Sequence, residues 1–418
     1  MTAKNPRISN SRALTIVIKL GTSSICEEET HLPLLSNLSL LIETIVKLRK
    51  LGHRVVLVTS GAIGVGLRRL NMEKKPKKLS AIQAVAAVGQ GRLMRMYDDL
   101  FSQLNQPIAQ ILLTRNDIAD RTQYRNAVNT FSELLAIGVV PIVNENDTIS
   151  VSEIRFGDND TLSAIAAKMV NADYLFLMTD VDCLYTDNPR LNPDARPVEI
   201  VEDVGALREQ VKITSPGSAL GTGGMITKLT AADLATAAGV TTIICRGSTP
   251  QNILTIISHL SINPTITTSD DSSIPLHTRF LAKKNPLTDR KWWILHGLHT
   301  AGTLVIDEGA YKALTRPGQS SSLFAAGIVR VEGNFIADQA VKVVVDLKKR
   351  NLDSNNDGAS GNDDLCAEVK EIGKGLVNYS SVEITRIKGH QSSEIAELLG
   401  YADSECVIHR DNFSIFVT

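Results

Sequence analysis

The sequence predicts an α/β protein. We expect a three-layer αβα sandwich on an open, mostly parallel sheet, followed by a small, mainly β barrel-like domain. Residues 14–260 alternate short β-branched runs with longer amphipathic stretches. Several of these runs are continuously apolar, which is typical of parallel strands buried on both faces. From residue 291 onward, short strand patterns follow one another with few helical patterns between them.

Each element of this plan has its own segment. In the first part, strands are expected at 14–20, 54–60, 108–114, 139–144, 173–179 and 241–245. The helices that cover the sheet are expected at about 36–51, 79–104, 121–137, 160–171, 225–238 and 249–260. In the last part, strands are expected at 302–307, 327–333, 341–347, 382–387 and 406–410, with one short helix at 392–400.

Changes in composition divide the chain into domains. Residues 1–262 form the expected catalytic domain, and residues 263–290, rich in Ser, Thr and Pro, form a linker. Residues 291–418 form the expected second domain. Inside it, residues 348–364 are rich in Asn, Asp, Gly and Ser, which predicts a flexible insert between two strands.

Composition also narrows the class of protein. The 418 residues carry a net charge of −1, so no global basic field points to nucleic acid or to a membrane surface. The sequence contains no run of about 18 apolar residues, which a transmembrane helix needs. The polar N-terminus leads into a strand pattern rather than a signal peptide. Five scattered cysteines without a C-x-x-C pair argue against a zinc site or a disulfide framework. We therefore expect a cytoplasmic protein.

Glycine and polar residues follow the predicted strands. The segments are KLGTSS, TSGAIGVG, NENDT and TDVDCLYTDNP, with GTGGMITK just before a predicted helix. Ligands of parallel sheets bind at this edge, and glycines such as Gly21 and Gly61 let the backbone approach a phosphate. Lys19 and Lys228 suit a phosphoryl group in transfer, because its oxygens need positive charge. A carboxylate between the two lysines, such as Asp160, would relieve their repulsion.

The acidic cluster 158–160 has a second interpretation, because Asp or Asn before an apolar helical period is also typical of a helix N-cap. GTGGMITK lacks the Walker spacing, and GAIGVG is not a dinucleotide fingerprint. Asp158, Asp180 or the phosphates themselves could help to hold Mg²⁺. No histidine lies in these loops. A carboxylate acceptor is already ionised at pH 7 and needs no general base, so the site favours an acyl-phosphate product.

Eight segments in this order resemble the glutamate 5-kinases (γ-glutamyl kinases) of the amino-acid kinase family. They are VIKLGTSS, VTSGAIGVG, AVGQGRLMRMYDDLF, LLTRNDIADR, PIVNENDT, FGDNDTLSA, LMTDVDCLYTDNPR and GTGGMITKLTAAD. Segments such as RKWWILHG and AGTLVIDEGA resemble the C-terminal PUA domain of those kinases. The resemblance implies the amino-acid kinase fold and ATP-dependent phosphorylation of the γ-carboxylate of L-glutamate, the first step of proline synthesis.

The resemblance also implies roles for individual residues. Lys19 and Lys228 would stabilise the transferring phosphoryl group, and Asp160 would organise them. Ser60, Asp147 and Asn159 would bind glutamate. The ATP-binding residues would be Lys19, Thr179, Asp180, Thr222, Gly223, Gly224, Met225, Ile226, Thr227 and Lys228. Feedback inhibition by proline is implied too, with Asp117 and Glu153 in segments that could sense it. A separate γ-glutamyl phosphate reductase is an expected pathway partner, and a homo-oligomer is expected.

Three alternatives stay open. The acceptor could be another carboxylate, a carbamate or a nucleotide within the same fold. The PUA-like domain could bind RNA, although residues 290–418 contain 14 Lys and Arg against 17 Asp and Glu, a net charge of −3. That domain could instead be a structural tail that mediates oligomerisation.

Overall fold

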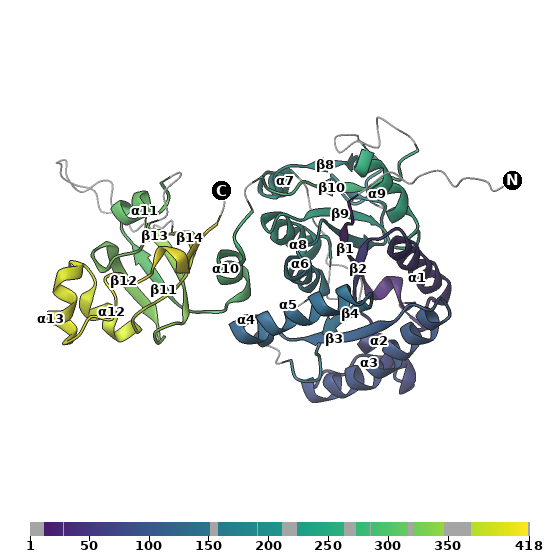
Figure 1. The fold of residues 1–418 in the computed structure, drawn as a ribbon, viewed down its shortest axis with the longest axis horizontal. Helices are drawn as coiled ribbons and strands as arrows, with labels where there is room; N and C mark the ends of the chain where they lie inside the picture. Colours follow the sequence, from purple (N-terminus) through teal and green to yellow (C-terminus); the bar gives the residue numbers. More distant parts are fainter. Residues whose placement is uncertain are drawn as a thin grey trace, which may run out of the picture. The chain divides into compact units, whose positions relative to one another are not determined.

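The computed structural model describes residues 12–27, 29–150, 158–189, 191–210, 224–262, 273–284, 286–316, 321–346 and 369–416. The chain divides into two compact units, Met1–Pro286 and Leu287–Thr418 (Figure 1). No helix of the described segments is long and apolar enough to cross a membrane. The four cysteines among them, Cys26, Cys183, Cys245 and Cys406, are buried free thiols.

The first unit is built on an eight-stranded sheet in the order β3-β4-β2-β1-β5-β9-β10-β8. Its strands are β1 (Thr15–Leu20), β2 (Arg54–Thr59), β3 (Ile108–Leu113), β4 (Val140–Glu145), β5 (Tyr174–Thr179), β8 (Ile200–Val201), β9 (Thr241–Arg246) and β10 (Thr278–Phe280). In the described part of this sheet the β9–β10 pair is antiparallel and the other pairs are parallel. The carboxyl ends of β1, β2, β4, β5 and β9 therefore meet at one edge.

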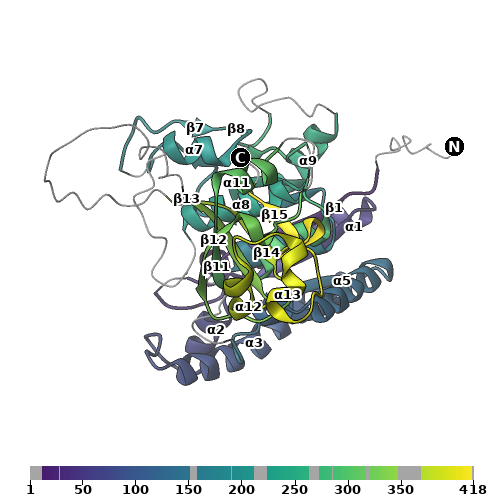
Figure 2. The same ribbon diagram turned by 90° about the vertical axis from the view of Figure 1, so that its left-hand side faces the viewer.

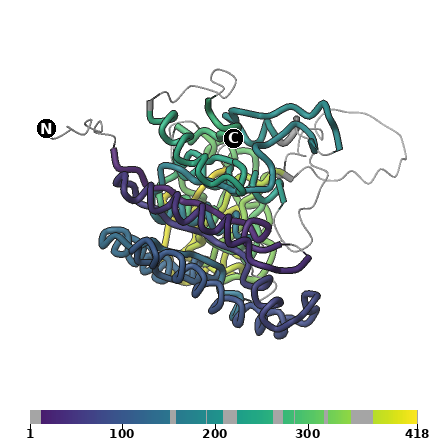
Figure 3. Tube along the Cα trace, turned by 90° about the vertical axis from the view of Figure 1, so that its right-hand side faces the viewer, coloured from purple at the N-terminus to yellow at the C-terminus, as the bar shows by residue number. Residues whose placement is uncertain are grey.

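Helices cover both faces of this sheet, which confirms the three-layer prediction. One face carries α1 (Leu35–Lys50), α3 (Leu79–Ser102) and α9 (Asn252–Ile262), which share one buried core with the sheet. Figure 3 shows α1, in purple, lying in front of the strands. The other helices are α2 (Ala62–Arg69), α4 (Arg115–Ala119), α5 (Arg121–Ala136), α6 (Asn159–Met169), α7 (Val204–Gln210) and α8 (Met225–Ala237). A short hairpin pairs β6 (Leu184–Tyr185) with β7 (Pro197–Val198).

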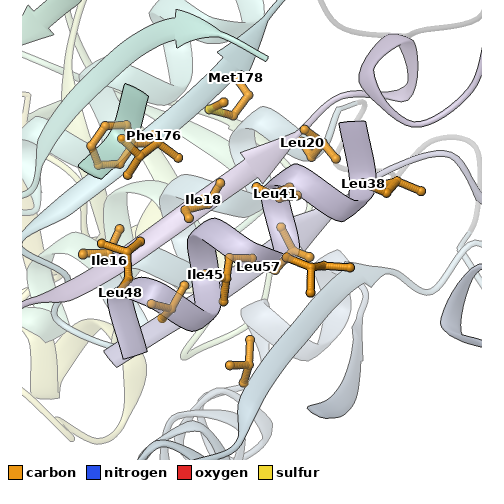
Figure 4. Close-up of a cluster of buried hydrophobic side chains, with 14 of the residues drawn as sticks. Ile16, Ile18, Leu20, Leu38, Leu41, Ile45, Leu48, Leu57, Phe176 and Met178 are labelled. Atoms are coloured by element: carbon orange, nitrogen blue, oxygen red, sulfur yellow. The ribbon is translucent and has the colours of Figure 1, made fainter. Parts of the chain in front are cut away.

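A buried apolar core between β1 and α1 holds β1, the strand that carries Lys19, in place (Figure 4). Alternate strand residues, among them Ile18 and Leu20, belong with Leu41 and Ile45 to this buried cluster. Burying each such side chain contributes roughly 1.5–3 kcal/mol. Successive strand residues point to opposite faces, so Lys19 points away from α1. The sequence pattern of β1 therefore directs one lysine toward the other helical layer, where α6 lies.

The second unit holds a five-stranded sheet in the order β12-β11-β13-β14-β15. Its strands are β11 (Thr300–Ile306), β12 (Ile328–Gly333), β13 (Ala340–Asp346), β14 (Val369–Leu376) and β15 (Phe413–Ile415). Its helices are α10 (Asp289–Trp292), α11 (Glu308–Leu314), α12 (Ser381–Ile387) and α13 (Ile395–Leu399). Figure 2 faces this unit and shows α12 and α13 in yellow beside the strands.

Two strand predictions in this unit are wrong. Residues 382–387 form most of helix α12, because Ser380 and Glu383 make a capping box and Ile384 and Ile387 bury one helical face. Residues 406–410 form no strand: Ile408 makes an isolated bridge, and Arg410 begins a short 3-10 helix. Strand β14 was not predicted at all. The predicted flexible insert, 348–364, lies outside the described residues.

Candidate active site

Strand register places the first predicted site residues next to one another. Lys19 lies opposite Val58 of β2 and Leu177 of β5, so β1 is flanked by two parallel strands. The loop after β2 begins at Ser60, and β5 ends at Thr179. Residues from three separate parts of the sequence thus meet at the same sheet edge, which is where a ligand of a parallel sheet is expected.

A buried cluster of charges lies at this edge. The Nζ atom of Lys19 is 2.5 Å from Oδ1 of Asp160, and Nζ of Lys228 is 3.3 Å from Oδ2 of the same carboxylate. The exposed fractions are 4% for Lys19, 0% for Asp160 and 6% for Lys228. One carboxylate therefore holds two buried ammonium groups, as the charge-balance hypothesis predicted. The three groups together carry one excess positive charge, which suits an anionic ligand.

The pKa values follow from this arrangement. Burial alone would raise the pKa of the Asp160 carboxyl, but the charges of Lys19 and Lys228 outweigh it and lower the pKa to about 2. The pKa of Lys228 is lowered, first by burial and then by the charge of Lys19, while Asp160 opposes the shift. Asp160 is therefore a firmly ionised anchor.

The start of α8 adds a further contact to Asp160. The hydroxyl of Thr227 lies 2.7 Å from Oδ2 of Asp160 and 2.7 Å from the carbonyl oxygen of Gly224, the N-cap of α8. A Cβ at Gly21 would lie 3.6 Å from Nζ of Lys19. The β1 loop therefore passes directly beside this buried ammonium group. Backbone N–H groups at the start of a helix, such as α8, favour phosphate.

The start of α6 separates two roles within the acidic cluster. Oδ1 of Asp158 accepts a hydrogen bond from the backbone N–H of Thr161 at 2.7 Å, so Asp158 is the N-cap. Asp160, in the first turn, faces the lysines instead. Burial raises the pKa of Asp158. Among the described residues, no group of three or more His, Cys, Asp or Glu side chains is arranged to hold a metal ion.

A network of amides and hydroxyls lies next to the charged cluster. Nδ2 of Asn159 lies 2.9 Å from the carbonyl oxygen of Thr59, 2.8 Å from Oγ of Ser60 and 3.0 Å from Oδ1 of Asn144. Gly61 follows with φ +94°, a conformation that favours glycine, and α2 starts immediately after it. The structure therefore brings Ser60 and Asn159 together, one residue from Asp160.

The remaining predicted residues are more dispersed. Asp147 is half-buried in the turn after β4, and the hydroxyl of Thr179 donates to the exposed Asp180 at 3.1 Å. Met225 is half-buried and Ile226 exposed in the first turn of α8. The predicted residues Thr222, Gly223 and Glu153 lie outside the described residues.

Asp117 does not contact the charged cluster. Its carboxylate accepts from the backbone N–H and the hydroxyl of Thr114, both at 2.6 Å, and so closes the capping box of α4. The capping box alone explains why residue 117 is an aspartate, so its presence does not by itself indicate a ligand-binding role.

Two polar pairs were not predicted. Asn144 donates to Gln90 of α3 at 2.8 Å, and Arg246 makes a bidentate ion pair with Asp182 at 2.5 and 2.8 Å. The signal for Gln90 is a polar residue on the buried face of a long amphipathic helix. The signal for Asn144 is a polar side chain at the end of a buried apolar strand.

Comparisons with known proteins agree with this architecture. A model described as the amino acid kinase family matches residues 14–247, and a PUA domain model matches residues 302–399. A probable glutamate 5-kinase of Schizosaccharomyces pombe is 57% identical over 404 residues, which cover 96% of this chain and 94% of that protein. The glutamate 5-kinase of Rippkaea orientalis is 48% identical, covering 96% of this chain and 99% of its own. That of Nostoc punctiforme is 50% identical, covering 95% and 98%.

Proposed function

This chain belongs to the amino acid kinase family, in its glutamate 5-kinase branch, and on that premise we propose that it transfers the γ-phosphoryl group of ATP to the γ-carboxylate of L-glutamate. The product, γ-glutamyl phosphate, is the first intermediate of proline synthesis. The observation that best supports a phosphoryl-transfer site is the buried cluster of Lys19, Asp160 and Lys228.

The proposed mechanism uses these residues for charge stabilisation. A γ-carboxylate oxygen of glutamate forms a bond to the γ-phosphorus while the bond to the β,γ-bridging oxygen breaks and ADP leaves with the electron pair. No proton has to move, because the acceptor is ionised at pH 7. Lys19 and Lys228 stabilise the charge on the phosphoryl oxygens, and Asp160 keeps their ammonium groups in place. The N-terminus of α6, next to Asp160, adds positive potential.

The acceptor lies, in this proposal, beside the amide network. Ser60 and Asn159 hold glutamate, and Asp147 in the turn after β4 receives its α-ammonium group. Asn159 and Asp160 are consecutive residues in the first turn of α6, which supports this placement. A glutamate bound at Asn159 would lie next to a phosphoryl group bound at the lysines of Asp160.

We propose that Mg²⁺ arrives with ATP. The described residues offer no three-carboxylate site, and Asp158 is already engaged as a helix cap. A Mg²⁺ ion bound mainly through phosphate oxygens and water, with one or two carboxylates, fits this donor set. Asp158 and Asp180 are the candidate carboxylates for this contact. Bound there, Mg²⁺ would neutralise phosphate charge.

Inhibition by proline at a site overlapping that of glutamate is a further part of the proposal. Asp117 and Glu153 are the candidate sensing residues. The test is proline inhibition of wild type and of Asp117→Asn, in which asparagine keeps an acceptor oxygen for the cap. A weak inhibition that Asp117→Asn leaves unchanged would count against Asp117 as a sensor.

A hydroxamate assay tests the proposed function. Protein, ATP, Mg²⁺, L-glutamate and hydroxylamine are expected to yield γ-glutamyl hydroxamate. Lys228→Ala should lower the rate by at least about 100-fold, the loss typical of one transition-state donor. Lys47→Ala is the matched control, because Lys47 lies in an exposed pair with Glu43 on α1. Aspartate, N-acetylglutamate and UMP as acceptors test the alternatives, and a higher rate with any of them would contradict glutamate.

A further inference from the structure

Three amide side chains from three elements form a continuous relay at the acceptor side of the site. Gln90 of α3 is 9% exposed, and its Oε1 accepts from Nδ2 of Asn144 at 2.8 Å. Oδ1 of Asn144 accepts from the backbone N–H of Glu145 at 2.9 Å and from Nδ2 of Asn159 at 3.0 Å. Gln90 therefore lies two hydrogen bonds away from Asn159.

The relay sets which end of each amide points where. A side-chain amide has a donor end and an acceptor end, so a fixed partner at one end decides the orientation of the other. Oε1 of Gln90 and the N–H of Glu145 together turn Oδ1 of Asn144 toward Asn159. Asn159 directs Nδ2 inward, toward Asn144, the carbonyl oxygen of Thr59 and Oγ of Ser60, and its Oδ1 points away. That oxygen is buried and accepts no hydrogen bond from the described residues.

Close helix packing fixes the backbone that carries Gln90, while Nε2 of Gln90 is buried without a hydrogen-bond partner among the described residues. A Cβ at the preceding residue, Gly89, would lie 1.7 Å from the carbonyl oxygen of Ala62, and one at Gly66 would lie 2.1 Å from that of Val85. The backbones of α2 and α3 therefore touch without intervening side chains. The loop of Ser60 and Gly61 leads directly into α2, which packs against α3. The same loop is also reached by the relay, because Asn159 contacts Ser60.

We propose that Gln90 is a positioning residue for the acceptor: through Asn144 it acts together with the carbonyl oxygen of Thr59 and Oγ of Ser60 to hold the amide of Asn159, so that Oδ1 accepts a hydrogen bond from the α-ammonium group of the amino acid. An unpartnered buried oxygen needs such a donor, and a charged donor gives the stronger bond. This inference rests on the proposed function, because an amino-acid acceptor supplies the ammonium group. The relay thereby distinguishes an α-amino acid from its deaminated analogue.

Steady-state kinetics of Gln90→Met test this. Methionine has a similar length but cannot accept from Asn144. The KM for glutamate should rise by about 10- to 100-fold, the effect of one lost charge-assisted hydrogen bond. The KM for ATP should change less than about twofold, and so should the inhibition constant of glutarate, which lacks the ammonium group. Gln90→Glu, which keeps an acceptor oxygen, should recover most of the loss. Gln103→Met at the exposed end of α3 is the matched control.

The outcomes separate the two proposals. An unchanged KM for glutamate in Gln90→Met, with wild type active, would overturn the positioning role alone. So would equal increases for glutamate, glutarate and ATP, which indicate general loosening of the site. A wild type that yields no γ-glutamyl hydroxamate would overturn the proposed function, and with it the ammonium contact.

Discussion

Lys19 and Asp160 form a buried ion pair between β1 and α6, with Nζ and Oδ1 2.5 Å apart. Breaking such a pair from one side leaves an uncompensated buried charge, which costs about 3–5 kcal/mol. Here the carboxylate also faces Lys228, so its loss would leave two buried ammonium groups unbalanced. We therefore expect this pair to matter for both turnover and stability.

The first prediction compares two neighbouring aspartates. Asp160→Asn should lower the rate of hydroxamate formation by at least about 100-fold, since the amide cannot hold two lysines by charge. Asp158→Asn is the matched control for the cap, because asparagine caps a helix about as well as aspartate. It should retain a much higher rate than Asp160→Asn. Similar rates in the two variants would indicate that Asp160 is no more than part of the helix start.

The second prediction concerns acid stability. Asp160 has a pKa lowered from 3.8 to about 2 in the folded protein. A carboxyl group with a lowered pKa stabilises the fold above its unfolded pKa, and this stabilisation is lost as the pH falls through the folded pKa. The free energy of unfolding should therefore decrease between pH 4 and pH 2, by about 2 kcal/mol from this group. Denaturant unfolding at several pH values measures it, and Asp160→Asn should show a shallower decrease over that range.

The raised pKa of Asp158 works in the opposite direction. A carboxyl group with a raised folded pKa gains stability as the pH falls from that pKa toward its unfolded value. Asp158 titrates above pH 3.8, so it can offset the acid loss only at the upper end of the range. A decrease confined to the region above pH 4 would contradict the assignment to Asp160.

The main features of the fold could be predicted because buried strands have a strong pattern. The largely apolar run 14–20, interrupted by Lys19, corresponds to β1, which is buried along its length. Residues 382–387 misled the prediction, because Val, Ile and Thr favour strands while the capping box at Ser380 starts a helix. Strand β14 was missed because Gly373 and Gly375 weaken its pattern. Their missing side chains make room for Ser414 and Ile408, which only the tertiary structure reveals.

The candidate site could be predicted only where chemistry restricts the residue type. Two lysines and a carboxylate at a sheet edge follow from phosphoryl transfer, and the structure brings Lys19, Asp160 and Lys228 together. Glutamine and asparagine have no comparable restriction. The contact between Gln90 and Asn144 depends on how α3 packs against β4, which no local pattern contains.

The third prediction concerns Thr227. Its hydroxyl lies 2.7 Å from Asp160, so Thr227→Val should remove one hydrogen bond from the carboxylate without changing the side-chain shape. We expect kcat to fall by about 10-fold, the effect of a hydrogen bond to a charged group. Thr230→Val, one turn along α8, is the control, since that hydroxyl bonds the carbonyl oxygen of Ile226. Thr227→Ser should keep most of the rate, and equal losses in both valine variants would argue against a specific contact.

The last prediction separates two glycines of α3 that lie two positions apart. A Cβ at Gly89 would lie 1.7 Å from the carbonyl oxygen of Ala62, whereas one at Gly91 would meet nothing within 4 Å. Gly89→Ala must force α2 and α3 apart, so we expect a loss of about 1–3 kcal/mol or more in the free energy of unfolding, measured in urea. Gly91→Ala should instead add about 0.5–1 kcal/mol, because alanine favours a helix interior. Helix α3 carries Gln90, and α2 follows directly after Ser60. Displacing these helices should therefore raise the KM for glutamate in Gly89→Ala, while Gly91→Ala should leave it unchanged. Equal stability of the two variants would show that α2 and α3 do not depend on backbone contact.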